Sequence, residues 1–258
     1  MRVVAFVNNA VGLETLRAIQ RNGDTIVAVV VHPLESASLH REILDVAIDN
    51  DSAVIESTAL ADSSTIRQLV DLTPDIGVSA FFGHILRSEI IDIFKRGIIN
   101  LHPSFLPYNR GSYPNVWSIV DGTPIGATIH YIDEGIDTGP IIDQSQIEIT
   151  PEDTGESLYS RLESACNKLF SRTWPKISQA GGVLPASTQH LAAGTIHRIK
   201  DTKQIDCIDI EAQYKASDLL NVIRARTFAG YHGAYFESDG TKYFLQIKIE
   251  KENIGDDN

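Results

Sequence analysis

The chain has 258 residues, of which 43% are hydrophobic and 22% charged, a composition typical of a globular protein with a substantial core. Its 22 Lys and Arg against 34 Asp and Glu give a formal net charge of −12 at pH 7. This balance argues against nucleic acid as a partner, because binding to phosphates needs clustered basic side chains. Two cysteines, Cys166 and Cys207, are too few for a disulfide framework or a four-thiolate zinc site.

The first hundred residues alternate short apolar runs with amphipathic stretches. The apolar runs predict buried strands at 3–7, 26–31, 54–55, 76–82 and 98–99. The amphipathic stretches predict helices at 13–19, 43–48, 65–72 and 90–94. Such alternation is typical of βαβ units, so the predicted fold class is α/β: a Rossmann-like, doubly wound, mostly parallel sheet with helices on both faces.

The second half of the chain differs in composition. Residues 102–115 hold three prolines, a glycine and two asparagines, too many breakers for a helix or a central strand. Two longer strands are expected at 124–133 and 141–149, followed by a long helix at 154–179. The sequence therefore predicts a main domain over residues 1–182.

The remaining residues predict two further parts. Segment 183–209 is polar and irregular and is expected to be a linker. Residues 210–258 predict a small α+β domain with a helix around 217–226 and a hairpin that turns at Asp239-Gly240. The tail 251–258 is expected to be frayed.

Targeting and metal-binding signals are not found in the sequence. The N-terminal residues do not resemble a cleavable signal peptide, and no run approaches the roughly 20 apolar residues that span a bilayer. We therefore expect a cytoplasmic protein without a membrane partner. Six histidines have no metal-ligand spacing among them and are not interpreted as site residues: His32, His40, His130, His190, His197 and His232. No metal site is expected.

Polar side chains follow several predicted strands, where ligands bind in doubly wound sheets. These segments are Asn8-Asn9, Phe82-Gly83-His84 and Asn100 to Ser104. Asn100 and His102 are two residues apart, so at an extended strand end they point to the same side. An amide donor and an imidazole together suit charge stabilisation and proton transfer at one reacting centre.

A carboxylate for this centre is available in the loop between the two later strands. Asp133 and Asp137 flank Gly135, and either could orient or neutralise an imidazolium. Other interpretations stay open from the residues alone. Asn100 could cap a turn, Asn8 and Asn9 could cap a helix, and the two aspartates could be turn formers. His84 could be an exposed loop histidine.

Known nucleotide and nucleophile motifs are not present. No Gly-x-Gly-x-x-Gly follows the first strand, and there is no Gly-Lys-Ser phosphate loop, so a nucleotide cofactor held in the Rossmann manner is not supported. A Gly-x-Ser-x-Gly nucleophile elbow is also missing.

Two motifs resemble the signatures of the folate-dependent formyltransferases, which act on glycinamide ribonucleotide, methionyl-tRNA or nucleotide-linked sugars. The first is Asn100 to Pro107 with Arg110-Gly111-Ser112 and Pro114, and the second runs from Gly126 to Pro140. The resemblance covers roughly residues 1 to 180. A fainter similarity at 219–234 matches the C-terminal domain of the tRNA and sugar enzymes. It implies the formyltransferase fold, with 1–182 as the catalytic domain.

The resemblance also implies roles for individual residues. The catalytic trio of the family falls on Asn100, His102 and Asp137, which favours a functional Asp137 over a turn former. The implied co-substrate is 10-formyltetrahydrofolate, with no metal. Its pterin pocket falls on two segments, with Asp133 shaping the second: Phe82, Gly83, His84, Ile85 and Leu86, and then Asp133, Gly135 and Ile136.

Segment 108–117 resembles the sugar enzymes most, because Asn-x-Trp follows its proline. The expected activity is N-formylation of a nucleotide-linked (dTDP or UDP) amino sugar for a surface polysaccharide or glycan. Substrate contacts are expected from Asn8, Asn9, Arg110, Tyr113 and Asn115, with Arg110 on phosphate. A homodimer is implied, with the aromatic residues of the C-terminal hairpin as a shared face or as packing against their own helix.

Two alternatives remain. A methionyl-tRNA formyltransferase is disfavoured because residues 183–215 offer four basic side chains against four acidic ones, which is no basic channel. A non-catalytic folate-binding relative is disfavoured because a binding module has no need of Asn100, His102 and Asp137 together.

Overall fold

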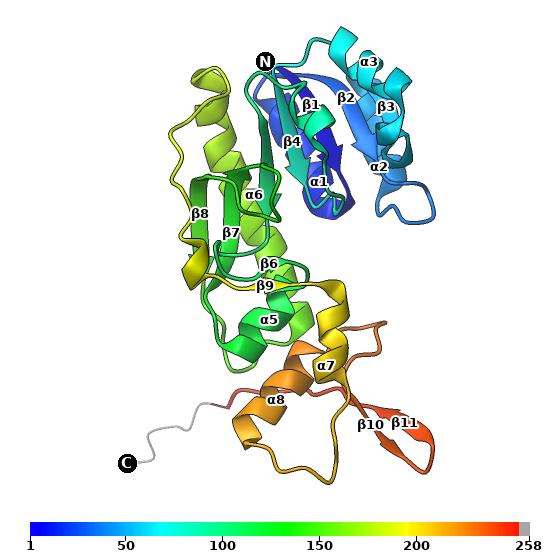
Figure 1. Ribbon diagram of the computed structural model, residues 1–258, viewed down its shortest axis with the longest axis vertical. Helices are drawn as coiled ribbons and strands as arrows, with labels where there is room; N and C mark the ends of the chain where they lie inside the picture. The colour runs from blue at the N-terminus through cyan, green and yellow to red at the C-terminus, as the bar shows by residue number, and fades with distance from the viewer. Residues whose placement is uncertain (253–258) are drawn as a thin grey trace.

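A seven-stranded sheet forms the centre of the structure, a computed structural model that describes residues 1–252 (Figure 1). Its order is β3 (Ala53–Glu56), β2 (Thr25–Val31), β1 (Arg2–Val7), β4 (Ile76–Ala80), β5 (Ile98–His102), β7 (Ile125–Tyr131) and β8 (Ile141–Ile147). The first five strands pair in parallel, and β7 and β8 run antiparallel. The mostly parallel sheet is therefore confirmed. Residues 253–258, most of the tail expected to fray, lie outside the described residues.

Helices cover both faces of the sheet. One face carries α1 (Asn9–Arg21), α2 (His40–Asp49) and α6 (Gly155–Gln179), and the other carries α3 (Ser63–Asp71) and α4 (Ser88–Ile91). Among residues 1–252, no helix combines the length and the apolar character needed to span a membrane.

Strand β1 shows why its sequence is apolar throughout. Val3, Ala5 and Val7 pack into the core under α1 and α6, whereas Val4 and Phe6 point to the opposite core under α3 and α4. Because side chains alternate along a strand, a strand buried on both faces reads as a continuous apolar run. The same burial positions the carboxyl ends of β1, β4 and β5 side by side.

A helix begins inside the proline-rich stretch where none was expected. Helix α5 (Pro114–Asp121) starts at Pro114, with Tyr113 as its N-cap at a φ of 56°. The prediction of no helix in residues 102–115 was wrong for the last two of them, Pro114 and Asn115, which begin this helix. Proline is favourable at the first helical position, since its missing N–H has no intrahelical acceptor there.

Segment 183–209, expected as a linker, is hydrogen-bonded to the main domain. It contains η2 (Leu191–Ala193), β9 (Ile196–His197), η3 (Ile199–Thr202) and α7 (Lys203–Asp206). Strand β9 pairs in parallel with β6 (Arg110–Gly111). This pairing brings residues 197–200 to the same side of the sheet as His102 at the carboxyl end of β5.

The C-terminal unit consists of α8 (Ala216–Ala225) and a hairpin of β10 (Tyr235–Ser238) and β11 (Thr241–Phe244) that projects away from the rest of the chain (Figure 1). Asp239 and Gly240 both have positive φ, 50° and 74°, as a tight hairpin turn of the predicted kind requires. Helix α8 is joined to the main domain by Arg224, whose Nη1 donates to the carbonyls of Thr150 and Asp153 at 3.1 and 2.9 Å.

Candidate active site

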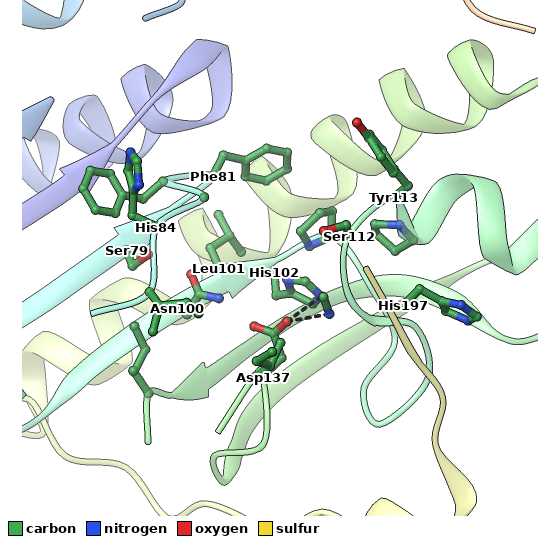
Figure 2. A pocket seen from close by; sticks show the side chains of 18 of the residues that line it. Ser79, Phe81, His84, Asn100, Leu101, His102, Ser112, Tyr113, Asp137 and His197 are labelled. Carbon is green, nitrogen blue, oxygen red and sulfur yellow. Dashed lines mark hydrogen bonds and ion pairs between the residues drawn. The ribbon is translucent and has the colours of Figure 1, made fainter. Parts of the chain in front are cut away.

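Strand β5 brings Asn100 and His102 into one cavity of about 850 Å³ at the carboxyl end of the sheet. His102 is buried and Asn100 half-buried. The cavity also receives the loop after β4 and the loop between β7 and β8. Figure 2 shows Asn100, His102 and Asp137 directed toward one another from these elements. The structure therefore brings the three residues of the expected trio together.

Asp137 lies between two imidazoles. Its Oδ2 is 3.6 Å from Nε2 of His102, and its Oδ1 is 3.7 Å from Nε2 of His130. Oδ2 also accepts a 2.8 Å hydrogen bond from the backbone N–H of Gly111. Nε2 of His102 is buried and has no hydrogen-bond partner among the described residues. An unpaired buried ring nitrogen beside a carboxylate is suited to exchanging a proton with a bound molecule.

His130 belongs to the site, although the sequence interpretation left it out. Its Nδ1 lies 2.8 Å from the carbonyl of Tyr131, which can only accept, so Nδ1 carries the hydrogen. Burial lowers the pKa of His130 to about 4, against the raising effect of Asp137, so the ring is neutral near pH 7. Its Nε2 therefore accepts from Nδ2 of Asn100 at 3.2 Å. This bond fixes which way the Asn100 amide faces.

The sequence did hold a signal for His130. The residue ends the segment Gly126 to His130 of the second signature. Strands β5 and β7 are antiparallel, and their register places His130 opposite Asn100. The expected sheet assigned no direction to β7, so the pairing could not be read from it.

Large apolar side chains line the cavity and stay exposed to it. Ile85 is 79%, Tyr113 43% and Ile136 37% exposed. An exposed apolar surface in one cavity is typical of a ligand site. All eight residues expected at the pterin pocket line this cavity: Phe82, Gly83, His84, Ile85, Leu86, Asp133, Gly135 and Ile136. The lining fits a flat ring with polar edges.

His84 is an exposed loop residue, as one interpretation of the sequence had it, and it also lines the cavity and contacts its neighbours. Its ring packs against His32 with centroids 4.5 Å apart, and His32 Nε2 is hydrogen-bonded to the carbonyl of Phe82. Burial and the neighbouring His32 lower the pKa of His84. The packing of the two rings links the loop that follows β4 to His32 at the end of β2.

The expected substrate contacts divide into two groups. Tyr113 and Asn115 line the cavity, whereas Asn8, Asn9 and Arg110 are not among its lining residues. Asn9 Oδ1 accepts from the N–H groups of Val11 and Gly12, the contacts of a helix cap. Asn8 Oδ1 accepts from the N–H of Ser38. Asn115 Nδ2 donates to the carbonyl of Gly155.

Segment 183–209 contributes side chains that sequence reasoning missed. Among the described residues that line the cavity, the Arg and Lys side chains are Arg198 and Lys200. The His197 ring stacks on Trp117 with centroids 4.0 Å apart. No motif marks these residues, because the backbone pairing of β9 with β6 is what places them. Within residues 1–252, no group of three or more His, Cys, Asp or Glu is arranged to hold a metal ion.

Comparison with known families gives two matches. Residues 1–174 match the formyl transferase family, and residues 201–251 match the N-formyltransferase dimerization C-terminal domain. A methionyl-tRNA formyltransferase from Thermodesulfovibrio yellowstonii is 33% identical over 68% of this chain and 59% of its own length. A dTDP-4-amino-4,6-dideoxyglucose formyltransferase from Mycobacterium bovis is 34% identical over 60% of this chain and 65% of its own. The chain thus spans less than two thirds of these curated relatives.

Three solved structures are similar to the chain. A 4-N formyltransferase from Francisella tularensis has a TM-score of 0.81 at 24% identity, over 97% of this chain and 98% of its own. A Mycobacterium tuberculosis protein, for which a sugar N-formyltransferase activity has been suggested, has a TM-score of 0.78 at 26% identity, over 98% of both chains. The formyltransferase from Anoxybacillus kamchatkensis, solved with UDP-4,6-dideoxy-4-formamido-L-AltNAc and tetrahydrofolate, has a TM-score of 0.53 at 25% identity, over 79% and 89%.

Proposed function

Because the chain belongs to the formyl transferase family, we propose that it moves a formyl group from 10-formyltetrahydrofolate to the amine of a nucleotide-linked amino sugar, with dTDP or UDP as the nucleotide. The observation that carries this proposal is the convergence of Asn100, His102 and Asp137 at one end of the cavity. The family implies formyl chemistry, and this geometry supplies the groups that such chemistry needs.

The folate is assigned to the apolar side of the cavity. Ile85 and Ile136 present exposed apolar side chains there, and their burial under a flat ring is favourable. The backbone groups of Gly83 and Gly135 lie in the same lining and can bind the polar edge of the ring. When bound, the folate supplies an activated formyl group.

Asn100 and His102 stabilise the charge that develops during transfer. Attack by the amine converts the formyl carbonyl oxygen into an oxyanion, which needs donors already in place. Asn100 uses one N–H of Nδ2 on His130 and keeps the other for this oxygen. A protonated His102 provides the second donor, and the carboxylate of Asp137 at 3.6 Å stabilises its positive charge.

The same groups move the proton. The attacking amine must lose a proton, and the folate nitrogen must gain one as it leaves. His102 can carry it, or a water held by Asp137 can do so. Atoms balance without a further reactant, because the proton released by the amine is the one taken up by the folate nitrogen.

Charge favours a sugar nucleotide over tRNA. The chain carries a net charge of −12, and among the described residues the Arg and Lys side chains at the cavity are Arg198 and Lys200. Two cations suit one pyrophosphate, whereas tRNA binding needs an extended basic surface. A methionyl-tRNA formyltransferase activity is the second candidate, favoured by the 33% identity to the T. yellowstonii enzyme.

We also propose that the chain forms a homodimer through its C-terminal unit. Leu220, Tyr243 and Phe244 are 47%, 47% and 45% exposed there. The match of residues 201–251 to a dimerization domain supports this assignment. Light scattering on the purified protein measures the mass directly, and a monomer at micromolar concentration would rule it out.

The activity is tested with 10-formyltetrahydrofolate and a panel of amines. The panel holds dTDP- and UDP-linked amino sugars, with initiator methionyl-tRNA as the competing substrate. Tetrahydrofolate release and the mass of the product report transfer. We expect formylation of at least one sugar nucleotide. Formylation of the tRNA alone would establish the second candidate, and folate binding without turnover on any amine would indicate a non-catalytic relative.

A further inference from the structure

Asp137, the carboxylate that faces His102, has a backbone conformation that needs support. Its φ of 52° lies in the left-handed region, which is unfavourable for residues that carry a Cβ. Within its own loop, Asp133 Oδ1 accepts hydrogen bonds from Gly135 N at 3.0 Å and Thr138 Oγ1 at 2.6 Å. These bonds order the tip of the loop without reaching Asp137, so the residue is held from elsewhere.

Gln189 holds the backbone of this loop. Its Nε2 donates to the carbonyl of Asp137 at 3.0 Å and to that of Gly139 at 2.7 Å. Both carbonyls can only accept, so the amide must present its nitrogen, and each N–H has one acceptor. The Gln189 side chain is buried and is not among the residues that line the cavity. It therefore acts on the loop and touches no bound substrate.

The carboxylate itself is held by Gly111, whose N–H donates to Oδ2 of Asp137 at 2.8 Å. Gly111 is in turn held by β9, through the bond from Ser112 N to the carbonyl of His197 at 2.9 Å. A Cβ at position 111 would lie 2.3 Å from that carbonyl oxygen, so only glycine lets the two strands come this close. Gln189 and β9 are neighbours in sequence.

This stretch, residues 187–197, is fastened to the main domain along its length. Ser187 and Ile141 exchange two backbone hydrogen bonds of 2.8 Å. Thr195 Oγ1 accepts from Asn109 N at 2.8 Å. Gly194 passes so close to the main domain that a Cβ there would lie 2.2 Å from the carbonyl oxygen of Pro107. The stretch is therefore a fixed strap.

We propose that the strap, residues 187–197, positions the carboxylate of Asp137 opposite His102, and that Gln189 is a positioning residue for formyl transfer. The inference rests on the proposed function for its reaction. It assigns a role in the catalytic centre to a segment that carries none of the trio. Because Gln189 donates to the carbonyls of Asp137 and Gly139 and lines no part of the cavity, its loss lowers the rate of the chemical step more than it weakens binding of the sugar nucleotide.

The test compares Gln189→Met with Thr188→Val, an exposed neighbour on the same strap. Methionine keeps the length of the side chain and removes both donors. We expect kcat to fall about 10- to 100-fold with KM for the sugar nucleotide within about twofold, because small displacements of catalytic groups cost this much. Thr188→Val keeps the wild-type kcat. A Gln189→Met enzyme with kcat within about twofold of wild type would overturn the proposal.

Two additions keep the test decisive. Gln189→Asn serves as a second variant if the methionine variant does not fold, because it retains a buried amide. Its side chain is one methylene too short to reach both carbonyls, so we expect the same loss of kcat. A crystal structure of either variant measures the separation of Asp137 Oδ2 and His102 Nε2, 3.6 Å here. We expect it to increase, and an unchanged loop would refute the positioning role. A wild-type chain without formyl transfer would refute the proposed function only, because the crystallographic comparison needs no activity.

Discussion

The amide nitrogen of Asn100 lies 3.2 Å from Nε2 of His130, directly across the antiparallel pair of β5 and β7. The histidine is held in one tautomer by its own bond to the carbonyl of Tyr131. Asn100 therefore cannot rotate its amide without losing an acceptor. The structure thus fixes the direction of the amide proposed as an oxyanion donor through a residue that does not itself need to touch substrate.

Replacing His130 should lower the rate without removing any group of the trio. In His130→Leu the Asn100 amide loses its acceptor and can flip its oxygen toward the developing oxyanion. We expect kcat to fall about 10- to 100-fold, below the cost of deleting a donor outright. His130→Gln, which offers an amide oxygen as acceptor, should recover part of the loss. Steady-state kinetics of both variants check this, and equal rates for the two would contradict it.

Acid should destabilise the protein through the same histidine. His130 has a pKa of about 4 in the folded chain against an ordinary histidine value of 6.5, because burial disfavours its charged form. Between these values the unfolded chain binds more protons, so the free energy of unfolding falls as pH falls from 6.5 to 4, by about 3 kcal/mol. The lowered pKa of His84 acts in the same direction. Urea unfolding at pH 7, 5.5 and 4.5 measures the slope.

The control for this pH dependence is His130→Leu. It removes the titrating group and keeps His84, so its stability should depend less on pH over the same range. A wild-type free energy of unfolding that is constant from pH 7 to 4.5 would show that His130 titrates normally. Asp24, Asp143 and Asp153 also have lowered pKa values, since their hydrogen bonds outweigh the raising effect of burial, but they act below this range.

Removing the side chains proposed as catalytic should strongly reduce turnover and preserve the fold. We expect His102→Ala and Asp137→Ala to lose about 100- to 1000-fold in kcat, the usual cost of losing a donor or its counter-charge. Asp137→Asn separates charge from position, because its amide oxygen can still accept from Gly111 and asparagine tolerates a φ of 52°. It should be as inactive as Asp137→Ala. Near-wild-type formylation by any of the three would refute the assignment.

The cations of the cavity should control affinity for the sugar nucleotide. Arg198→Ala and Lys200→Ala should each raise its KM about 3- to 10-fold, more at low salt, because both side chains are exposed and their charge is screened. The KM for the folate should stay unchanged. Lys203→Ala, on the same segment and outside the cavity lining, is the matched control. If Arg110→Ala raised this KM more than Arg198→Ala or Lys200→Ala does, the phosphate would instead lie at Arg110, as the sequence predicts.

Much of the fold could be predicted because burial leaves a direct trace in the sequence. Strands buried on both faces, such as β1, read as unbroken apolar runs, and the hairpin turn at Asp239-Gly240 follows from its need for positive φ. Helix α5 was missed because Pro114, a helix breaker in the interior, stands at its first position.

The candidate site could be predicted only in part. Asn100 and His102 share one strand end, so their spacing alone brings them together. The second signature contains His130, but only the antiparallel register of β5 and β7 shows that it lies opposite Asn100. Gln189 acts on the Asp137 loop through a bond between segments far apart in the sequence, which leaves no local pattern. Arg110 was chosen for its forked charge, whereas the position of a cation relative to a cavity depends on backbone pairing, which places Arg198 there instead.

The parallel pairing of β9 with β6 has a practical meaning for anyone who recombines these enzymes. A chimera joined after residue 182 would inherit the trio from one parent and Gln189, β9 and Arg198 from the other. Both residue pairs between β6 and β9, Arg110 with Ile196 and Gly111 with His197, would then join residues of different parents. A single larger residue in place of Gly111 would force the two strands apart. Grafts that aim to exchange only the C-terminal unit should therefore be joined beyond Lys200, where the last cavity residue of this segment lies.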